Sequence, residues 1–186
     1  MLLLSIIFLT CTGVLSQVPG IGNCPKVKVI QDFNASKYMG LWYAATKYFA
    51  IFEFGGKCTT ANYSLNSNGS VNVINRQINI LTERPSTIEG IARVKSNQTE
   101  GKLEVVFPSL PGKFSAPYWI LDTDYDNYAV VFSCTDLGLF HFKIVWILTR
   151  KPDPPSLIVQ QALDVLKKNN LSSLLLIKTD QKHCIH

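Results

Sequence analysis

The sequence lacks the features that mark nucleic-acid-binding, metal-binding and membrane-spanning proteins. Its net charge of +5 is spread along the chain without a cluster of lysine and arginine, so we expect no nucleic-acid partner. The three histidines, His141, His183 and His186, have no metal-site spacing, and no cysteine pair has the C-x-x-C spacing of zinc ligands. We therefore expect no metal. Beyond the N-terminus, no apolar run reaches the roughly 18 residues that span a bilayer.

The first residues have the composition of a secretory signal peptide. Positions 2–15 form an apolar run without an acidic or basic side chain, and Val14, Leu15 and Ser16 suit cleavage by signal peptidase. We expect a signal peptide at residues 1–16 and a single domain at residues 17–186. That domain has no internal repeat, and it is predicted to be secreted into the extracellular space.

The cysteines and the glycosylation sequons agree with secretion. Of the five cysteines, Cys11 lies in the expected signal peptide, and the remaining four imply two disulfides. Four cysteines can form two disulfides in three ways, and the count alone does not choose among them. Five Asn-x-Ser/Thr sequons are candidate glycosylation sites on the surface: Asn34, Asn62, Asn68, Asn97 and Asn170.

Eight short segments alternate apolar and polar residues with the period of a β-strand. They lie at residues 41–49, 58–65, 70–80, 87–95, 102–107, 116–123, 128–134 and 141–149. Residues 50–57, with Gly55 and Gly56, are predicted to form a long flexible loop, and the other connections are short enough for antiparallel neighbours. This spacing predicts an all-β fold, either an up-and-down barrel or a sandwich.

A helix and a ninth strand are predicted after the eighth strand. Pro154 and Pro155 favour a helix start, and Asn169 and Asn170 end the pattern. The apolar face of this helix is predicted at Ile158, Ala162, Val165 and Leu166. The ninth strand is predicted at the apolar residues 173–179.

Three motifs far apart in the chain carry a family resemblance. Gly40-Leu41-Trp42-Tyr43 opens the first strand, Thr123-Asp124-Tyr125 follows the sixth, and Arg150 follows the eighth. In residue type, order and spacing they resemble the three conserved motifs of the lipocalin family. Within that family the chain is similar to the branch that contains apolipoprotein D and its insect relatives. This similarity is carried by residues 62–65, 88–90, 115–121, 123–129 and 146–150.

The resemblance implies an eight-stranded antiparallel up-and-down β-barrel, closed at one end by the N-terminal turn, with a C-terminal α-helix and a ninth strand. It places Arg150 over Trp42 at the closed end as a cation–π contact. Gly40, Trp42, Thr123, Asp124, Tyr125 and Arg150 are therefore interpreted as structural. The family's disulfide pattern implies the pairs Cys24–Cys134 and Cys58–Cys184.

The barrel interior is the candidate ligand site. Small inward residues beside inward aromatics fit a ligand cavity and a solid core equally well. Asn75 shares a face with Val71 and Val73, and a buried amide there needs a ligand, water or a neighbouring group as its partner. By resemblance and strand phase, the predicted ligand-binding residues are Tyr63, Val73, Asn75, Phe107, Tyr118, Ser133 and Trp146.

We therefore predict a secreted carrier of a small hydrophobic molecule, such as a fatty acid, a retinoid or a sterol-like lipid. The alternative is a pigment protein that binds a bilin such as biliverdin, as insect relatives often do. No cofactor is required in either case, and the expected state is a monomer.

Enzymatic and interaction roles are weaker hypotheses. Lipocalin-type prostaglandin synthases use a free cysteine as the nucleophile, whereas all four cysteines of the predicted mature chain are expected in disulfides. No Ser/His/Asp arrangement is visible, so we predict a protein that is not an enzyme. Phe49, Phe52 and Phe54 near the barrel mouth suggest peripheral contact with a membrane or lipoprotein, although they would equally serve loop packing.

Overall fold

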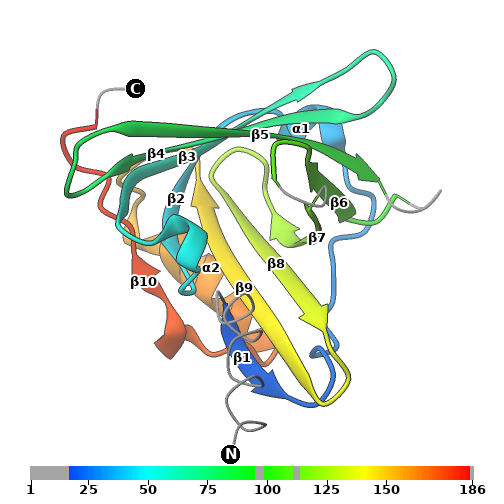
Figure 1. The fold of residues 1–186 in the computed structure, drawn as a ribbon. Helices are drawn as coiled ribbons and strands as arrows, with labels where there is room; N and C mark the ends of the chain where they lie inside the picture. The colour runs from blue at the N-terminus through cyan, green and yellow to red at the C-terminus, as the bar shows by residue number, and fades with distance from the viewer. Residues whose placement is uncertain (1–16, 95–98, 111–113, 185–186) are drawn as a thin grey trace, which may run out of the picture.

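The computed structural model describes residues 17–94, 99–110 and 114–184 (Figure 1). The expected signal peptide at residues 1–16 and the sequon at Asn97 lie outside these ranges. Within them, the dominant feature is an antiparallel sheet that curls until its first and last long strands meet.

Eight consecutive strands form the barrel, and each pairs with its neighbour in the sequence. Their bounds are β2 Gly40–Lys47, β3 Gly56–Leu65, β4 Val71–Asn79, β5 Pro85–Val94, β6 Lys102–Phe107, β7 Phe114–Thr123, β8 Tyr128–Asp136 and β9 Phe140–Thr149. Strands β2 and β9 also pair with each other, with Tyr43 opposite Thr149, and this pairing closes the barrel. The predicted all-β fold is confirmed as a closed barrel rather than a sandwich.

The two faces of the sheet bury different residues. Trp42 and Tyr63 belong to the cluster inside the barrel, whereas Val130 and Phe132 belong to a second cluster on its outer side. Every residue of β8 from Tyr128 to Cys134 is buried because both of its faces are covered. A strand covered on both sides reads as a continuous apolar run instead of an alternating one.

The outer cover is α2, Ser156–Lys168, which lies behind β9 in Figure 1. It buries Ala162, Val165 and Leu166 against the outer cluster, as the predicted apolar face requires. Asn169 ends the helix, and its side-chain amide donates to the carbonyl oxygen of Val165 at 2.9 Å. The predicted helix is therefore confirmed.

Two short strands flank the barrel, and sequence patterns described them poorly. β1, Val18–Ile21, pairs with β9 and was not predicted, because Pro19 and Gly20 are unfavourable in strands. At Gly20 a Cβ atom would come within 2.3 Å of the His141 ring, so this pairing needs glycine.

The last strand is much shorter than predicted. Only β10, Ile177–Lys178, pairs with β2, whereas Ser173–Leu175 forms the 3₁₀ turn η2. Leu174 is 94% exposed, so the apolar pattern at residues 173–179 does not reflect burial in a sheet.

The predicted loop at residues 50–57 is partly ordered. Ile51–Glu53 forms the 3₁₀ helix η1, and β3 begins at Gly56, which pairs with Asn79 of β4. We call residues 50–55 the mouth loop. Its 3₁₀ turn presents Glu53 to residues of the barrel wall, which a freely flexible loop would not do.

Arg150 fastens the closed end of the barrel. Its guanidinium carbon lies 3.7 Å from the ring centroid of Trp42, a cation–π geometry. Nη1 donates to the carbonyl oxygen of Leu41 at 2.9 Å, and Nη2 donates to that of Met39 at 2.8 Å. Nε donates to the carbonyl oxygen of Tyr125 at 3.0 Å. One side chain therefore links β9, β2 and the β7–β8 connection.

Gly40 and the short helix α1, Ala35–Tyr38, shape this contact. Gly40 has φ +92°, and a Cβ there would lie 3.3 Å from Nη1 of Arg150. Trp42 is fully buried, and its indole N–H donates to the carbonyl oxygen of Tyr38 at 2.8 Å. The backbone turn thus gives the indole both its partner and its place beneath the guanidinium.

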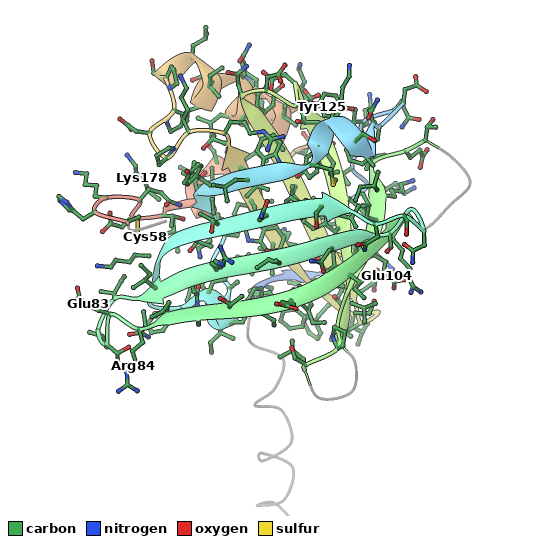
Figure 2. The ribbon with its side chains drawn as sticks, turned by 90° about the horizontal axis from the view of Figure 1, so that it is seen from above. Cys58, Glu83, Arg84, Glu104, Tyr125 and Lys178 are labelled. Atoms are coloured by element: carbon green, nitrogen blue, oxygen red, sulfur yellow. A yellow bond between two sulfur atoms is a disulfide. The ribbon has the colours of Figure 1, made fainter. Side chains whose placement is uncertain are left out.

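The Thr123-Asp124-Tyr125 motif forms the turn between β7 and β8. Asp124 Oδ1 accepts from the backbone N–H groups of Asn127 at 2.8 Å and Tyr128 at 3.0 Å. Burial would raise the pKa of Asp124, but these hydrogen bonds outweigh it and lower the pKa below its usual range. Tyr125 lies beside α1 in Figure 2, where its hydroxyl accepts from the backbone N–H of Asn34 at 3.1 Å.

Two disulfides hold the chain ends to the barrel, and their pairing is the one that the resemblance implied. Cys24 is bonded to Cys134 of β8, and Cys58 of β3 is bonded to Cys184 in the C-terminal tail. Cys58 and Lys178 of β10 lie close together in Figure 2, where the backbone N–H of Cys58 donates to the carbonyl oxygen of Asp180 at 2.8 Å. In the described ranges, no helix has both the length and the apolar character to cross a bilayer.

We expect Arg150→Ala to lower the free energy of unfolding by about 2–4 kcal/mol, because it removes charge-assisted hydrogen bonds and the cation–π contact. Ligand affinity well below the melting temperature should change much less, since the residue lies at the closed end. Urea unfolding and ligand titration measure the two effects. Arg93→Ala, which removes an exposed arginine of β5, is the matched control. A larger loss of affinity than of stability would contradict this placement.

We expect the stability contribution of Asp124 to depend on pH. Because its pKa is lowered in the fold, the contribution is present above the ordinary aspartate pKa and is lost as the pH falls through the native value. Asp124→Asn should cost about 1 kcal/mol near neutral pH, and the deficit should shrink in acid. Urea unfolding across this pH range measures it, with the exposed Asp153→Asn as control. A deficit independent of pH would show that the charge is irrelevant.

Candidate functional site

A large cavity opens at the end of the barrel opposite Arg150. Its volume is about 700 Å³, and its wall comes from the mouth loop, the ends of β4, β6 and β8, and the beginnings of β5 and β9. Ile51, Phe52 and Leu110 contribute apolar surface, whereas Arg76 and Gln77 contribute polar groups. We call this the outer cavity.

A smaller inner cavity of about 80 Å³ lies deeper in the barrel. It shares five lining residues with the outer cavity, so the two adjoin: Gln17, Phe52, Glu53, Asn75 and Phe107. The structure places all seven residues predicted to bind ligand on the wall of the inner cavity: Tyr63, Val73, Asn75, Phe107, Tyr118, Ser133 and Trp146. Whether they bind a ligand stays a prediction.

The barrel is solid only toward its closed end. Beyond the inner cavity lies a void of about 10 Å³, lined by Phe33, Tyr38, Leu103 and neighbouring residues. This void is too small for a ligand and barely matches one water-sized sphere. Of the two alternatives that the sequence left open, a core that is solid throughout does not occur, because the open half of the barrel is hollow.

Asn75 and Ser133 supply polar groups to the inner cavity. In the described part of the chain, neither side chain forms a hydrogen bond with another residue, although Ser133 is only 4% exposed. Asn75 lines both cavities. A buried polar group with no protein partner costs free energy unless water or a ligand satisfies it. Both side chains are therefore available to a bound molecule.

Three tyrosines meet at the deep side of the inner cavity, and we call them the tyrosine cluster: Tyr38, Tyr63 and Tyr118. The Tyr118 hydroxyl oxygen lies 2.9 Å from that of Tyr38 and 2.7 Å from that of Tyr63. Burial raises the pKa of all three phenols above the ordinary value of tyrosine. They are consequently neutral hydrogen-bonding groups in the physiological pH range.

An ion pair fixes the mouth loop against the barrel wall. Glu53 Oε2 lies 2.7 Å from Nζ of Lys47 in β2, and both side chains are largely buried. The indole N–H of Trp146 in β9 donates to Glu53 Oε1 at 3.2 Å. Glu53 thus joins the loop to two strands at the boundary between the two cavities.

Sequence reasoning missed Glu53, Gln17 and Tyr38. Glu53 did carry a signal, since it is the only charged residue in the apolar stretch from Phe49 to Phe54, and such a residue needs a partner when the loop packs. Tyr38 carried none, because its hydroxyl reaches Tyr118 across 80 positions of sequence.

The predicted glycosylation sites that the structure describes are all exposed: Asn34, Asn62, Asn68 and Asn170. Within the same ranges, no three His, Cys, Asp or Glu side chains gather in a way that would hold a metal ion. All four described cysteines form disulfides, which leaves no thiol nucleophile among them.

Comparison with known proteins identifies the fold family. The family model described as a lipocalin-like domain matches residues 33–181, which is most of the chain. The chain belongs to the lipocalin family. This lipocalin is 39% identical to apolipoprotein D of Mus musculus over 181 residues, covering 94% of the chain and 93% of that protein. It is 38% identical to the Lazarillo protein of Schistocerca americana over 168 residues, covering 87% and 77%.

Solved lipocalin structures share the architecture of this chain. Insecticyanin from the tobacco hornworm Manduca sexta superposes with a TM-score of 0.81, and the match covers 90% of each chain. The sequence identity is 24%, so this likeness establishes the fold and does not identify a ligand. The predicted family and the similarity to apolipoprotein D are confirmed.

Proposed function

We propose that this lipocalin is an extracellular carrier that binds a small hydrophobic molecule in the barrel and transports or sequesters it. The observation that carries the proposal is the outer cavity of about 700 Å³, which adjoins an inner cavity lined by all seven predicted ligand-binding residues. Cavities of this size are typical of sites for drug-sized ligands.

The character of the wall supports an apolar ligand. Phe107 and Phe52 line both cavities, while Val73 and Trp146 line the inner one. A few polar groups, such as the Asn75 amide, lie among them. An apolar wall with a small number of polar anchors is the usual composition of a site that buries most of its ligand. The membership of the lipocalin family agrees with a carrier of this kind.

The proposed role is binding and not catalysis. A thiol mechanism needs a free cysteine, whereas all four described cysteines are paired in disulfides. Among its described lining residues, the inner cavity also contains no histidine that could act as a base. Secretion is supported by the signal-like residues 1–16 and by the two disulfides, which persist in oxidising compartments. We propose that the protein is glycosylated, since four sequons are exposed, and that it is a monomer.

Extraction of the protein from its native source tests the carrier function. An absorption spectrum followed by mass spectrometry of the solvent extract identifies the cargo. A colourless protein that yields a fatty acid, retinoid or sterol supports the lipid carrier. A red-region absorption band with a bilin mass would replace the lipid by a pigment. An empty extract, together with no binding of any of these compounds, would overturn the carrier function.

We expect Trp146→Ala to lower the affinity for the extracted ligand by about tenfold or more, because it removes apolar contact area from the inner cavity. Trp119→Ala is the matched control, since Trp119 packs against Phe132 in the outer cluster. That control should reduce stability and leave affinity unchanged. Titration by tryptophan fluorescence and urea unfolding measure the two quantities. Unchanged binding in Trp146→Ala would remove this residue from the site.

A second proposed role is contact of the barrel mouth with a lipid surface, where a hydrophobic ligand would be collected or delivered. Phe52 is 55% exposed and Phe54 is 73% exposed, although solvent exposure of large aromatics is unfavourable. Both belong to the mouth loop, and Phe52 also lines the outer cavity. Phe54 packs against Phe49, with ring centroids 6.0 Å apart.

We expect Phe54→Ser to weaken binding to phosphatidylcholine vesicles by about tenfold, because it removes one aromatic side chain from the contact. Vesicle flotation measures the bound fraction. Leu65→Ser, which removes an exposed apolar side chain at the end of β3 beside the closed end of the barrel, should have no effect. Equal effects of the two variants, or no flotation of the wild type, would contradict a mouth that contacts lipid.

A further inference from the structure

The inner cavity contains one charged residue among the described residues of its wall. That residue is Glu53, and within the described part of the chain no lysine, arginine or histidine lines the cavity beside it. The carboxylate is already paired with Lys47 at 2.7 Å, so no free cation is available there. A ligand carboxylate brought into this cavity would lose its water shell and face a like charge. The wall therefore disfavours a buried anion.

The tyrosine cluster offers the opposite kind of group, a hydrogen-bond donor. Three hydroxyl groups carry three protons, but the contacts of Tyr118 with Tyr38 and with Tyr63 use only two. In the described part of the chain, these hydroxyls have no other partner. One proton is therefore left over in every arrangement of the two hydrogen bonds.

The position of the leftover proton follows from the direction of those bonds. It belongs to Tyr63 when Tyr38 donates to Tyr118 and Tyr118 donates to Tyr63, and it belongs to Tyr118 when both neighbours donate to Tyr118. Both of these residues line the inner cavity. The proton is left on Tyr38, away from that cavity, only when Tyr63 donates to Tyr118 and Tyr118 donates to Tyr38. An acceptor atom in the inner cavity would select one of the first two arrangements.

We propose that the end of the ligand that enters the inner cavity is an uncharged oxygen-bearing group, a hydroxyl or a carbonyl. This group accepts a hydrogen bond from Tyr63 or Tyr118, while Glu53 and the absence of a free cation exclude a carboxylate. The inference rests on the proposed carrier function and narrows its ligand class to neutral oxygenated lipids, in preference to free carboxylic acids. An acid would bind with its carboxylate outside, toward Arg76, and would leave the tyrosine proton unpaired.

Two pairs of probes test this inference, and the two members of each pair have the same carbon skeleton. They are retinol with retinoic acid, and hexadecan-1-ol with hexadecanoic acid. Near neutral pH, where the acids are ionised, each alcohol should bind about tenfold tighter than its acid. Fluorescence titration and isothermal calorimetry measure the affinities. Acids that bind as tightly as the alcohols would overturn the inference and leave the carrier function standing. Binding of no probe would count against both.

Variants separate the two proposed sources of selectivity, the tyrosine hydroxyl donors and the Glu53 carboxylate. The variant Tyr63→Phe/Tyr118→Phe should weaken alcohol binding by about fivefold to tenfold and leave acid binding unchanged, because it removes both hydroxyl donors on the wall of the inner cavity. The double variant Lys47→Gln/Glu53→Gln replaces the ion pair by neutral amides and should bring acid affinity closer to that of the alcohol. Tyr128→Phe is the control, since its hydroxyl donates to Asp122 at 3.0 Å and the residue belongs to the outer cluster.

The control should leave all four affinities unchanged, and melting temperatures report whether each variant remains folded. Unchanged alcohol binding in folded Tyr63→Phe/Tyr118→Phe would remove the tyrosine donors from the site. An unchanged ratio of alcohol to acid affinity in folded Lys47→Gln/Glu53→Gln would show that Glu53 does not determine selectivity.

Discussion

The contact between Arg150 and the closed end of the barrel is the constraint on which the rest of the structure depends. Its guanidinium covers the buried Trp42 ring and donates to carbonyl oxygens of β2 and of the β7–β8 connection. These segments are far apart in the sequence, and each leaves backbone carbonyls that need a partner. An arginine suits the position because its planar group stacks on an aromatic ring while its donors point outward in the same plane. This contact closes one end of the barrel, and the outer cavity opens at the other end.

The hollow interior is compatible with a stable fold because much of the apolar burial lies outside the barrel. The outer cluster packs α2 against β7 and β8, and within this cluster Phe132, Ile147 and Leu166 are almost completely buried. Interior packing is concentrated near Trp42 and the tyrosine cluster. A barrel of eight strands is just wide enough to hold one small ligand. The side chains that stabilise the fold by burial and the side chains that line the cavities thus lie in different regions of the same sheet.

The polar groups of the cavity are arranged in layers along the barrel. Arg76 lies at the outer cavity, Glu53 and Asn75 lie at the boundary, and the tyrosine hydroxyls lie at the deep side. Burial makes Glu53 and the tyrosine hydroxyls selective, because an unpaired donor or an uncompensated charge costs much more there than in water. The mouth loop contributes to this selectivity directly, since its ion pair with Lys47 holds a carboxylate over the inner cavity.

The sequence by itself determined the eight strands, the helix, the motifs of the closed end and seven of the residues that line the inner cavity. Strand periodicity fixes which side chains share a face of the sheet. The resemblance to the lipocalin family supplied the rest: the closed barrel, the face that lies inward, and the structural role of the glycine, tryptophan and arginine motifs. Only the tertiary structure decided that β1 pairs despite Pro19, that Glu53 reaches Lys47 and Trp146, and that three tyrosine hydroxyls meet. Tyr38 and Tyr118 are 80 residues apart, and contacts of that kind depend on how the closed sheet brings distant strands together, which no local pattern records.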